Sequence, residues 1–185
     1  MSEDEQKIKE AVMEIEGRVR KIIDDGFRTY TMYMRQLLDF QKEITPLTEE
    51  VAHAFKYRLV NVVSIDDLRL VGTCTNLLAK QLNRLMEFNN TFLKDLKELT
   101  IVLVTLSFYA SLYTTHKYVT EYDKQTLARM FNVIDDKIKN VEKELMGLKV
   151  RLKGTSRIPK EAIDALKVLQ KSIQETKERQ KNYVR

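Results

Sequence analysis

Residues 127–152, LARMFNVIDDKIKNVEKELMGLKVRL, hold the clearest structural pattern in the chain. Their large apolar residues are separated by alternating steps of four and three residues: Leu127, Phe131, Ile134, Ile138, Val141, Leu145, Leu148 and Leu152. Such steps place the apolar side chains on one narrow face of an α-helix, as in helices that pack along a seam. The pattern predicts a long helix that packs against other helices.

The residues that follow predict a second helix close behind the first. Gly154 is expected to end the first helix, and Pro159 is expected to begin the next one. The same apolar steps then continue at Ala162, Leu166, Leu169, Ile173, Thr176, Gln180 and Tyr183. Because a short connection joins antiparallel neighbours, we expect an antiparallel helical hairpin over residues 124–185. Residues 1–123 are expected to form a helical bundle.

The first part of the chain predicts two helices with a break at residue 45. Apolar residues again step by four and three at Ile8, Val12, Ile15, Val19 and Ile22, and then at Phe27, Tyr30, Met34, Leu37, Gln41 and Ile44. The sequence Asp24-Asp25-Gly26 is expected to interrupt the first helix. Thr45-Pro46 is expected to start a new one, with threonine as the N-cap and proline as the first helical residue.

The central part predicts a third long helix. Ser64 and Asp67 form a variant of the capping box at its start. The expected seam then consists of Val71, Thr75, Leu78, Leu82, Leu85, Asn89, Phe92, Leu96 and Leu99. The whole chain has only five Gly and two Pro among 185 residues, with 32% charged residues. This composition favours long helices over β-structure, so the predicted fold is an all-α, elongated bundle of heptad-patterned, coiled-coil-like helices.

Residues 99–115, LTIVLVTLSFYASLYTT, are apolar on every side of the predicted helix. We expect this segment to be the buried centre of the bundle, with insertion into a membrane as the alternative. Tyr109 and Tyr113 lie within it, and Asn89 is a polar residue on the expected seam. These three residues are candidates for a protein–protein interface.

The net charge of +5 is unevenly distributed. Residues 137–185 contain 14 Lys/Arg and 6 Asp/Glu, so the basic excess lies in the last quarter of the chain. Five cations surround the predicted turn of the hairpin: Lys149, Arg151, Lys153, Arg157 and Lys160. They are candidate contacts for an anion or a nucleic acid, although cations at a helix C-terminus also offset the helix dipole.

No pattern of catalytic or metal-binding residues is found. A single cysteine, Cys74, excludes an internal disulfide and is expected to be a small buried apolar residue. Glu50 and His53 match half of a di-metal motif that needs a second such pair. We expect a protein that is not an enzyme, with no catalytic residue, cofactor or metal. The charged start of the chain has no signal-peptide pattern, which favours a cytoplasmic location.

These observations predict a structural or assembly protein that acts through helix–helix interactions, most simply as a homo-oligomer. A nucleic-acid-associated factor that uses the basic C-terminal hairpin is the first alternative. A helical protein that inserts residues 99–115 into a membrane is the second. The partner is thus expected to be a protein, with a nucleic acid or a membrane as the other two classes.

Overall fold

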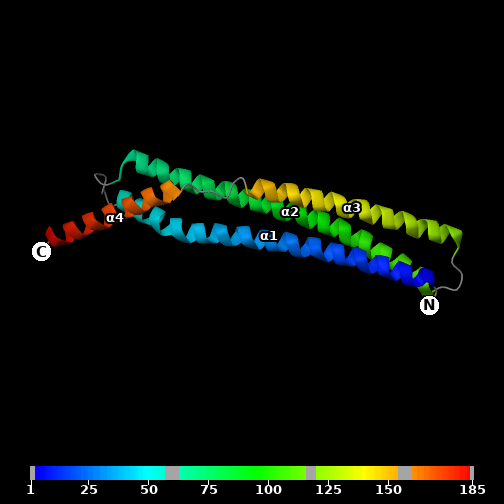
Figure 1. Ribbon diagram of the computed structural model, residues 1–185. Coiled ribbons are helices and arrows are strands. Elements are labelled where there is room, and N and C mark those ends of the chain that lie inside the picture. The colour runs from blue at the N-terminus through cyan, green and yellow to red at the C-terminus, as the bar shows by residue number, and fades with distance from the viewer. Residues whose placement is uncertain (1–2, 57–62, 116–119, 154–159, 184–185) are drawn as a thin grey trace. The chain divides into compact units, whose positions relative to one another are not determined.

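The computed structural model describes residues 3–56, 63–115, 120–153 and 160–183. These residues form four α-helices and no strand: α1 (Glu3–Lys56), α2 (Ile65–Thr115), α3 (Glu121–Lys153) and α4 (Lys160–Tyr183) (Figure 1). The predicted all-α helical bundle is confirmed for the described part of the chain.

The helices are shared between two compact units. Unit 1 comprises Met1–Thr31 and Glu87–Arg151, and unit 2 comprises Met32–Met86 and Leu152–Arg185. The helices α1 and α2 therefore contribute to both units, while nearly all of α3 belongs to unit 1 and α4 belongs to unit 2. The predicted turn at residues 154–159 lies outside the described residues, so the hairpin of residues 124–185 and the boundary after residue 123 stay predictions.

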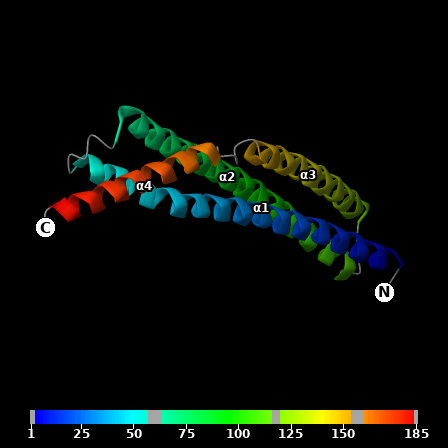
Figure 2. The ribbon, with the colours of Figure 1, turned by 60° about the vertical axis from the view of Figure 1, so that its left-hand side comes forward.

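In unit 1 the first half of α1 lies beside the second half of α2, and α3 lies along them (Figures 1 and 2). Arg18 pairs with Asp135, and Asp25 pairs with Lys149, so α3 runs parallel to α1. Glu98 of α2 pairs with Lys137, which fixes α2 against α3. The predicted seam of α3 is confirmed, because seven of its eight residues are buried: Leu127, Ile134, Ile138, Val141, Leu145, Leu148 and Leu152.

Gly26 does not interrupt α1, contrary to the expectation for Asp24-Asp25-Gly26. The helix continues through this residue, which is buried against the ring of Phe92 on α2. A Cβ atom at position 26 would overlap that ring. Phe92 in turn packs against Phe88 and Phe27, with ring centroids 5.9 and 6.1 Å away. The glycine therefore provides the space for an aromatic contact between two helices, which a rule based on local sequence cannot detect.

Pro46 also lies inside α1, so the predicted restart at Thr45-Pro46 is wrong. Proline removes one helical hydrogen bond and crowds the preceding turn, at a cost of about 3 kcal/mol. Apolar burial on both sides offsets this cost, since Ile44 and Leu47 are 3% and 4% exposed. Tertiary packing in unit 2 therefore keeps the helix continuous through a residue that usually ends one.

Unit 2 has an apolar core formed by α1, α2 and α4. Two clusters of buried residues fill it: Phe40, Ile44, Leu47, Cys74 and Leu166 in the first, and Val51, Ala54, Val63, Leu169 and Ile173 in the second. The predicted burial of Cys74 is confirmed. Of the predicted α4 seam, Leu166, Leu169 and Ile173 are buried, and Ala162 packs on the first cluster.

The seam of α2 is displaced by one residue at every second position. The predicted positions Leu85, Phe92 and Leu99 are buried. Between Leu85 and Phe92, however, the buried residue is Phe88. The predicted seam residue Leu82 is 41% exposed. The steps are therefore three and then four, because the large ring of Phe88 gains more from burial than Asn89 would. At the next such position, Asp95 and Leu96 are both half-buried.

The starts of α2 and α3 carry matching hydrogen bonds. The Asp67 carboxylate accepts from the Ser64 backbone N–H at 2.7 Å, and the Ser64 hydroxyl accepts from the Asp67 N–H at 3.2 Å, which confirms the predicted capping box. Thr120 and Asp123 make the same two bonds before α3, at 2.9 and 3.2 Å. The Thr-x-x-Asp sequence was the available signal for this second cap.

Candidate functional site

The cations predicted to contact an anion do not form one cluster within either unit. Lys149 is engaged in an ion pair with Asp25 of α1. Arg151 is an exposed residue of unit 1, while Lys153 and Lys160 are exposed residues of unit 2. Arg157 lies outside the described residues. The nucleic-acid alternative therefore loses Lys149 as a free cation, and the contacts assigned to the other four residues stay predictions.

Ion pairs between helices account for part of the basic excess near the C-terminus. Besides Lys149, three cations of α3 and α4 pair with carboxylates of α1 or α2: Lys137 with Glu98, Lys167 with Glu43, and Lys177 with Glu50 at 3.6 Å. Glu43 raises the pKa of Lys167, mainly through the hydrogen bond between them. Four cations from the last quarter of the chain thus pair with carboxylates from its first 98 residues, each pair within one unit.

The predicted interface residues all belong to α2 and to unit 1. Asn89, Tyr109 and Tyr113 are each half-buried. The Tyr109 ring meets the Phe108 ring edge-on, with centroids 5.8 Å apart. This contact places Tyr109 beside an exposed aromatic residue, since Phe108 is 60% exposed. Their role at an interface stays a prediction.

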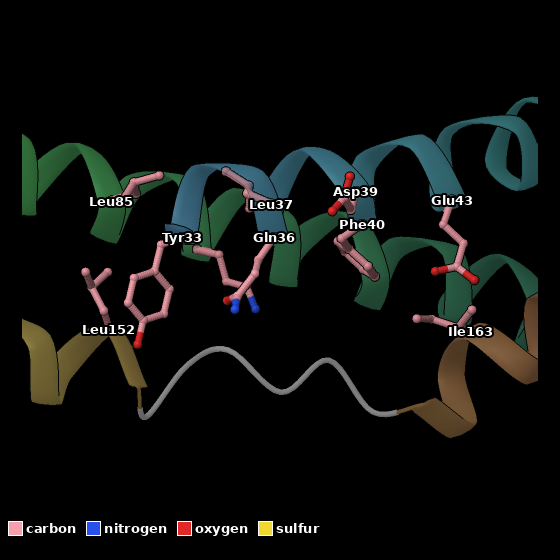
Figure 3. A pocket seen from close by; sticks show the side chains of 10 residues that line it. Tyr33, Gln36, Leu37, Asp39, Phe40, Glu43, Leu85, Leu152 and Ile163 are labelled. Atoms are coloured by element: carbon pink, nitrogen blue, oxygen red, sulfur yellow. The ribbon is translucent and has the colours of Figure 1, made fainter. Parts of the chain in front are cut away.

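A hollow of about 340 Å³ lies in unit 2 (Figure 3). Tyr33, Gln36 and Glu43 stand along one side of it on α1, and Leu152 and Ile163 face them from α3 and α4 (Figure 3). Burial raises the pKa of the Tyr33 phenol. The polar groups that line this hollow are amides, carboxylates and the Tyr33 phenol, which is harder to ionise than usual.

Unit 1 contains a pair of carboxyl groups that the sequence pattern did not predict. Asp95 of α2 and Glu144 of α3 share a hydrogen bond. Burial, this bond and the negative charges of Glu144 and Glu98 raise the pKa of Asp95 to about 6, although Lys137 opposes the shift. A protonated Asp95 donates the hydrogen bond to Glu144, so the contact depends on pH. Asp95 was missed because Leu96 is the more plausible seam residue by hydropathy.

The half-motif of Glu50 and His53 does not belong to a metal centre in the described part of the chain. Glu50 pairs with Lys177. Over residues 3–56, 63–115, 120–153 and 160–183, three or more His, Cys, Asp or Glu side chains do not gather in a geometry that suits a metal ion. His116 lies outside these ranges.

The apolar segment at residues 99–115 is not buried on all sides, contrary to the prediction. Leu99, Leu106 and Ala110 face the core, but Ile101, Val104 and Phe108 are 57%, 62% and 60% exposed. By length and composition, α2 contains an 18-residue window apolar enough to cross a membrane, and 17% of that window is buried. Unit 1 thus leaves one apolar face of α2 uncovered.

A groove between α1 and α2 borders this uncovered face. It contains two neighbouring hollows of about 520 and 470 Å³, which share Glu16 and Ser107. The α2 wall consists mainly of small and apolar residues, namely Leu103, Val104, Ser107, Ala110, Ser111 and Thr114. Charged residues alternate with apolar ones along the α1 wall: Glu5, Ile8, Lys9, Val12, Met13, Glu16, Val19, Arg20 and Ile23.

This groove and the exposed face beside it are the candidate functional surface of the chain. The sequence pattern indicated the apolar segment but not the groove, because the groove depends on which face of α1 meets α2. Searches against protein-family models, curated proteins and solved structures found no match for this chain.

Proposed function

We propose that this protein is a non-enzymatic assembly protein that associates with itself through helix–helix contacts of the coiled-coil kind. The observation that carries the proposal is the exposure of Ile101, Val104 and Phe108 on one face of α2. A contiguous apolar surface of this kind on a helical protein is typical of an interaction site. A second helix laid along it would bury these side chains in the way that bundle helices bury their seams.

The hydroxyl groups of residues 99–115 are compatible with an apolar partner surface. The Thr100 hydroxyl donates to the carbonyl of Leu96 at 2.7 Å, and the Thr105 hydroxyl donates to the carbonyl of Ile101 at 2.8 Å. Thr115 makes the same kind of bond to Ser111. A hydroxyl that is satisfied within its own helix can be covered by an apolar surface with little desolvation cost.

Insertion into a membrane is a second candidate, because α2 has the length and composition of a spanning helix. The charges of the neighbouring helices weigh against it. The Arg18 and Asp135 side chains pair at 2.6 Å and join α1 to α3 next to the apolar segment. Inserting α2 alone would require both helices to separate from it, and inserting all three would carry charges into the hydrocarbon.

The proposal is tested by light scattering on a size-exclusion column, without detergent and at low and high salt. The wild-type chain is expected to form a discrete oligomer at both salt concentrations, because the contact is mainly apolar. Phe108→Glu should weaken the oligomer at least tenfold, since the charge would be buried on association. Val168→Glu is the matched control, because Val168 is equally exposed but lies on α4.

A wild-type chain that is monomeric at every concentration would refute self-association. Flotation with vesicles of neutral and anionic lipids then tests the second candidate. Binding to vesicles that is lost in Phe108→Glu would support insertion.

A further inference from the structure

The charges on the groove face of α1 form a pattern that is complementary to itself. Glu5, Lys9, Met13, Glu16 and Arg20 follow each other at steps of four, four, three and four residues, which places them on one side of the helix. Their signs run negative, positive, neutral, negative, positive. All five line the groove of unit 1.

This order distinguishes the two ways in which two copies of the helix can meet. In a parallel pair, each residue faces its own copy, so Lys9 meets lysine and Glu16 meets glutamate. In an antiparallel pair centred between Val12 and Met13, Lys9 faces Glu16 of the partner subunit, and Glu5 faces Arg20 of the partner subunit. Both pairs form in the same register of the two helices, because the two residue numbers in each pair add up to 25.

Four of the five side chains are exposed to solvent. Lys9, Glu16 and Arg20 are exposed, and Met13 is 62% exposed at the centre of the pattern. The Lys7–Glu3 ion pair, by contrast, joins residues one turn apart on the same helix at 2.7 Å. Within the described ranges, Lys9, Glu16 and Arg20 form no ion pair.

The α2 side of the groove provides space for a partner helix. Ser107 and Ser111 line the larger hollow, of about 520 Å³, opposite Met13. Small residues allow two helices to approach closely, and Val104 at the end of the hollow adds apolar surface. A copy of α1 in the groove would therefore contact both walls.

From the sign pattern and the groove, we infer that the chain forms a two-fold dimer in which α1 packs antiparallel against α1 of a second copy. The axis passes beside Met13. Lys9 pairs with Glu16 of the partner subunit on both sides of the axis, and Glu5 pairs with Arg20 of the partner subunit further out. This inference rests on the proposed self-association, and it adds the groove face of α1, next to Val104, to the contact surface and identifies a second copy as the partner.

Charge reversal tests the arrangement. Lys9→Glu alone would place glutamate against Glu16 of the partner subunit, and Glu16→Lys alone would place lysine against Lys9 of the partner subunit. Each variant is expected to weaken the dimer at least tenfold, measured by analytical ultracentrifugation over a range of concentrations. Both residues are exposed, so circular dichroism and the melting temperature of each variant should stay close to those of the wild type.

Two forms of rescue follow from the antiparallel two-fold geometry. The double variant Lys9→Glu/Glu16→Lys should dimerise again as strongly as the wild type. An equimolar mixture of the two single variants should also form a dimer containing one chain of each, because both of its pairs then join opposite charges. A parallel dimer is distinguished by the single variants instead: there each reversal only exchanges one like-charge pair for another, so Lys9→Glu and Glu16→Lys would dimerise as the wild type does.

Cross-linking locates the axis independently. Met13→Cys is expected to form a disulfide-linked dimer on mild oxidation, because residue 13 of both copies lies beside the axis. Glu14→Cys, one residue away on a different side of α1, is the control and should cross-link at least tenfold more slowly. Cys74 is fully buried and does not compete.

The outcomes separate this inference from the proposed function. An oligomeric wild type whose Lys9→Glu and Glu16→Lys variants associate normally would overturn the inference and leave self-association standing. A wild type that is monomeric at all concentrations would overturn both. Loss in both single variants with rescue in the mixture would support both.

Discussion

The two units use the same two long helices but stabilise them by different means. Unit 2 encloses an apolar core that includes Cys74 and tolerates Pro46 within a helix. Unit 1 depends on the close fit of Gly26 and Phe92, and it holds the half-buried carboxyl group of Asp95 against Glu144. A core of mainly aliphatic side chains can adjust to a local defect, whereas an added methyl group at Gly26 would have to displace the Phe92 ring.

The largest expected effect comes from filling the space beside Gly26. In Gly26→Ala, the new methyl group overlaps the Phe92 ring, which must shift against Phe88 and Phe27. We expect the free energy of unfolding to fall by about 2 kcal/mol, as measured by urea denaturation. Gly17→Ala is the matched control in the same helix. Its Cβ meets no neighbouring atom, so it should gain up to about 1 kcal/mol. Equal effects of the two variants would show that unit 1 does not depend on this fit.

A smaller effect of opposite sign is expected at Pro46. Pro46→Ala restores a helical hydrogen bond and removes the crowding of the preceding turn. Alanine also makes the unfolded chain more flexible, which offsets part of the gain. We expect an increase in unfolding free energy of about 1–2 kcal/mol. Glu49→Ala, at an exposed position one turn later, gives the reference change in unfolding free energy for an alanine substitution in this helix. A loss of stability in Pro46→Ala would mean that the proline shapes the core of unit 2 rather than being tolerated by it.

The smallest effect is expected at Asp95, and it depends on pH. Its folded-state pKa of about 6 lies above the ordinary value of 3.8, so its contribution favours folding below pH 4 and is lost as the pH rises through 6. Asp95→Asn keeps the shape and a hydrogen-bond donor for Glu144 without the charge. We expect the variant to be more stable than the wild type by about 1 kcal/mol at pH 7.5, with the difference vanishing near pH 4.

Denaturation curves of wild type and Asp95→Asn at several pH values between 4 and 7.5 make this measurement. Glu142→Gln removes an exposed carboxylate from α3 and serves as the control. A difference between Asp95→Asn and the wild type that stays constant with pH would contradict the raised pKa.

The buried residues could be predicted from the sequence where a single pattern of apolar steps was present. In α3, the steps of four and three residues select Ile134, Ile138 and Val141, and all three are buried. In α2, two seams share Leu85, Phe92 and Leu99 and differ only at the positions between them. The predicted steps selected Asn89, whereas the structure buries the ring of the neighbouring residue Phe88.

The errors in α1 have a different cause. Gly26 and Pro46 are helix breakers by their local chemistry, but their positions are determined by residues far away in the sequence. The partner of Lys149 is similarly remote, because Asp25 is 124 residues away. A candidate anion contact was therefore a structural ion pair, and the groove of unit 1 could not be predicted before the pairing of α1 and α2 was known.

The burial of Cys74 makes its rate of chemical labelling a measure of how often unit 2 opens. It is the sole thiol of the protein, it is 0% exposed in the core of unit 2, and burial raises its pKa. A thiol reagent can reach it only when unit 2 opens, because the thiolate is the reactive form and the folded core excludes both water and reagent. The labelling rate therefore reports the opening of unit 2 alone, while a transient opening confined to unit 1 leaves no covalent mark.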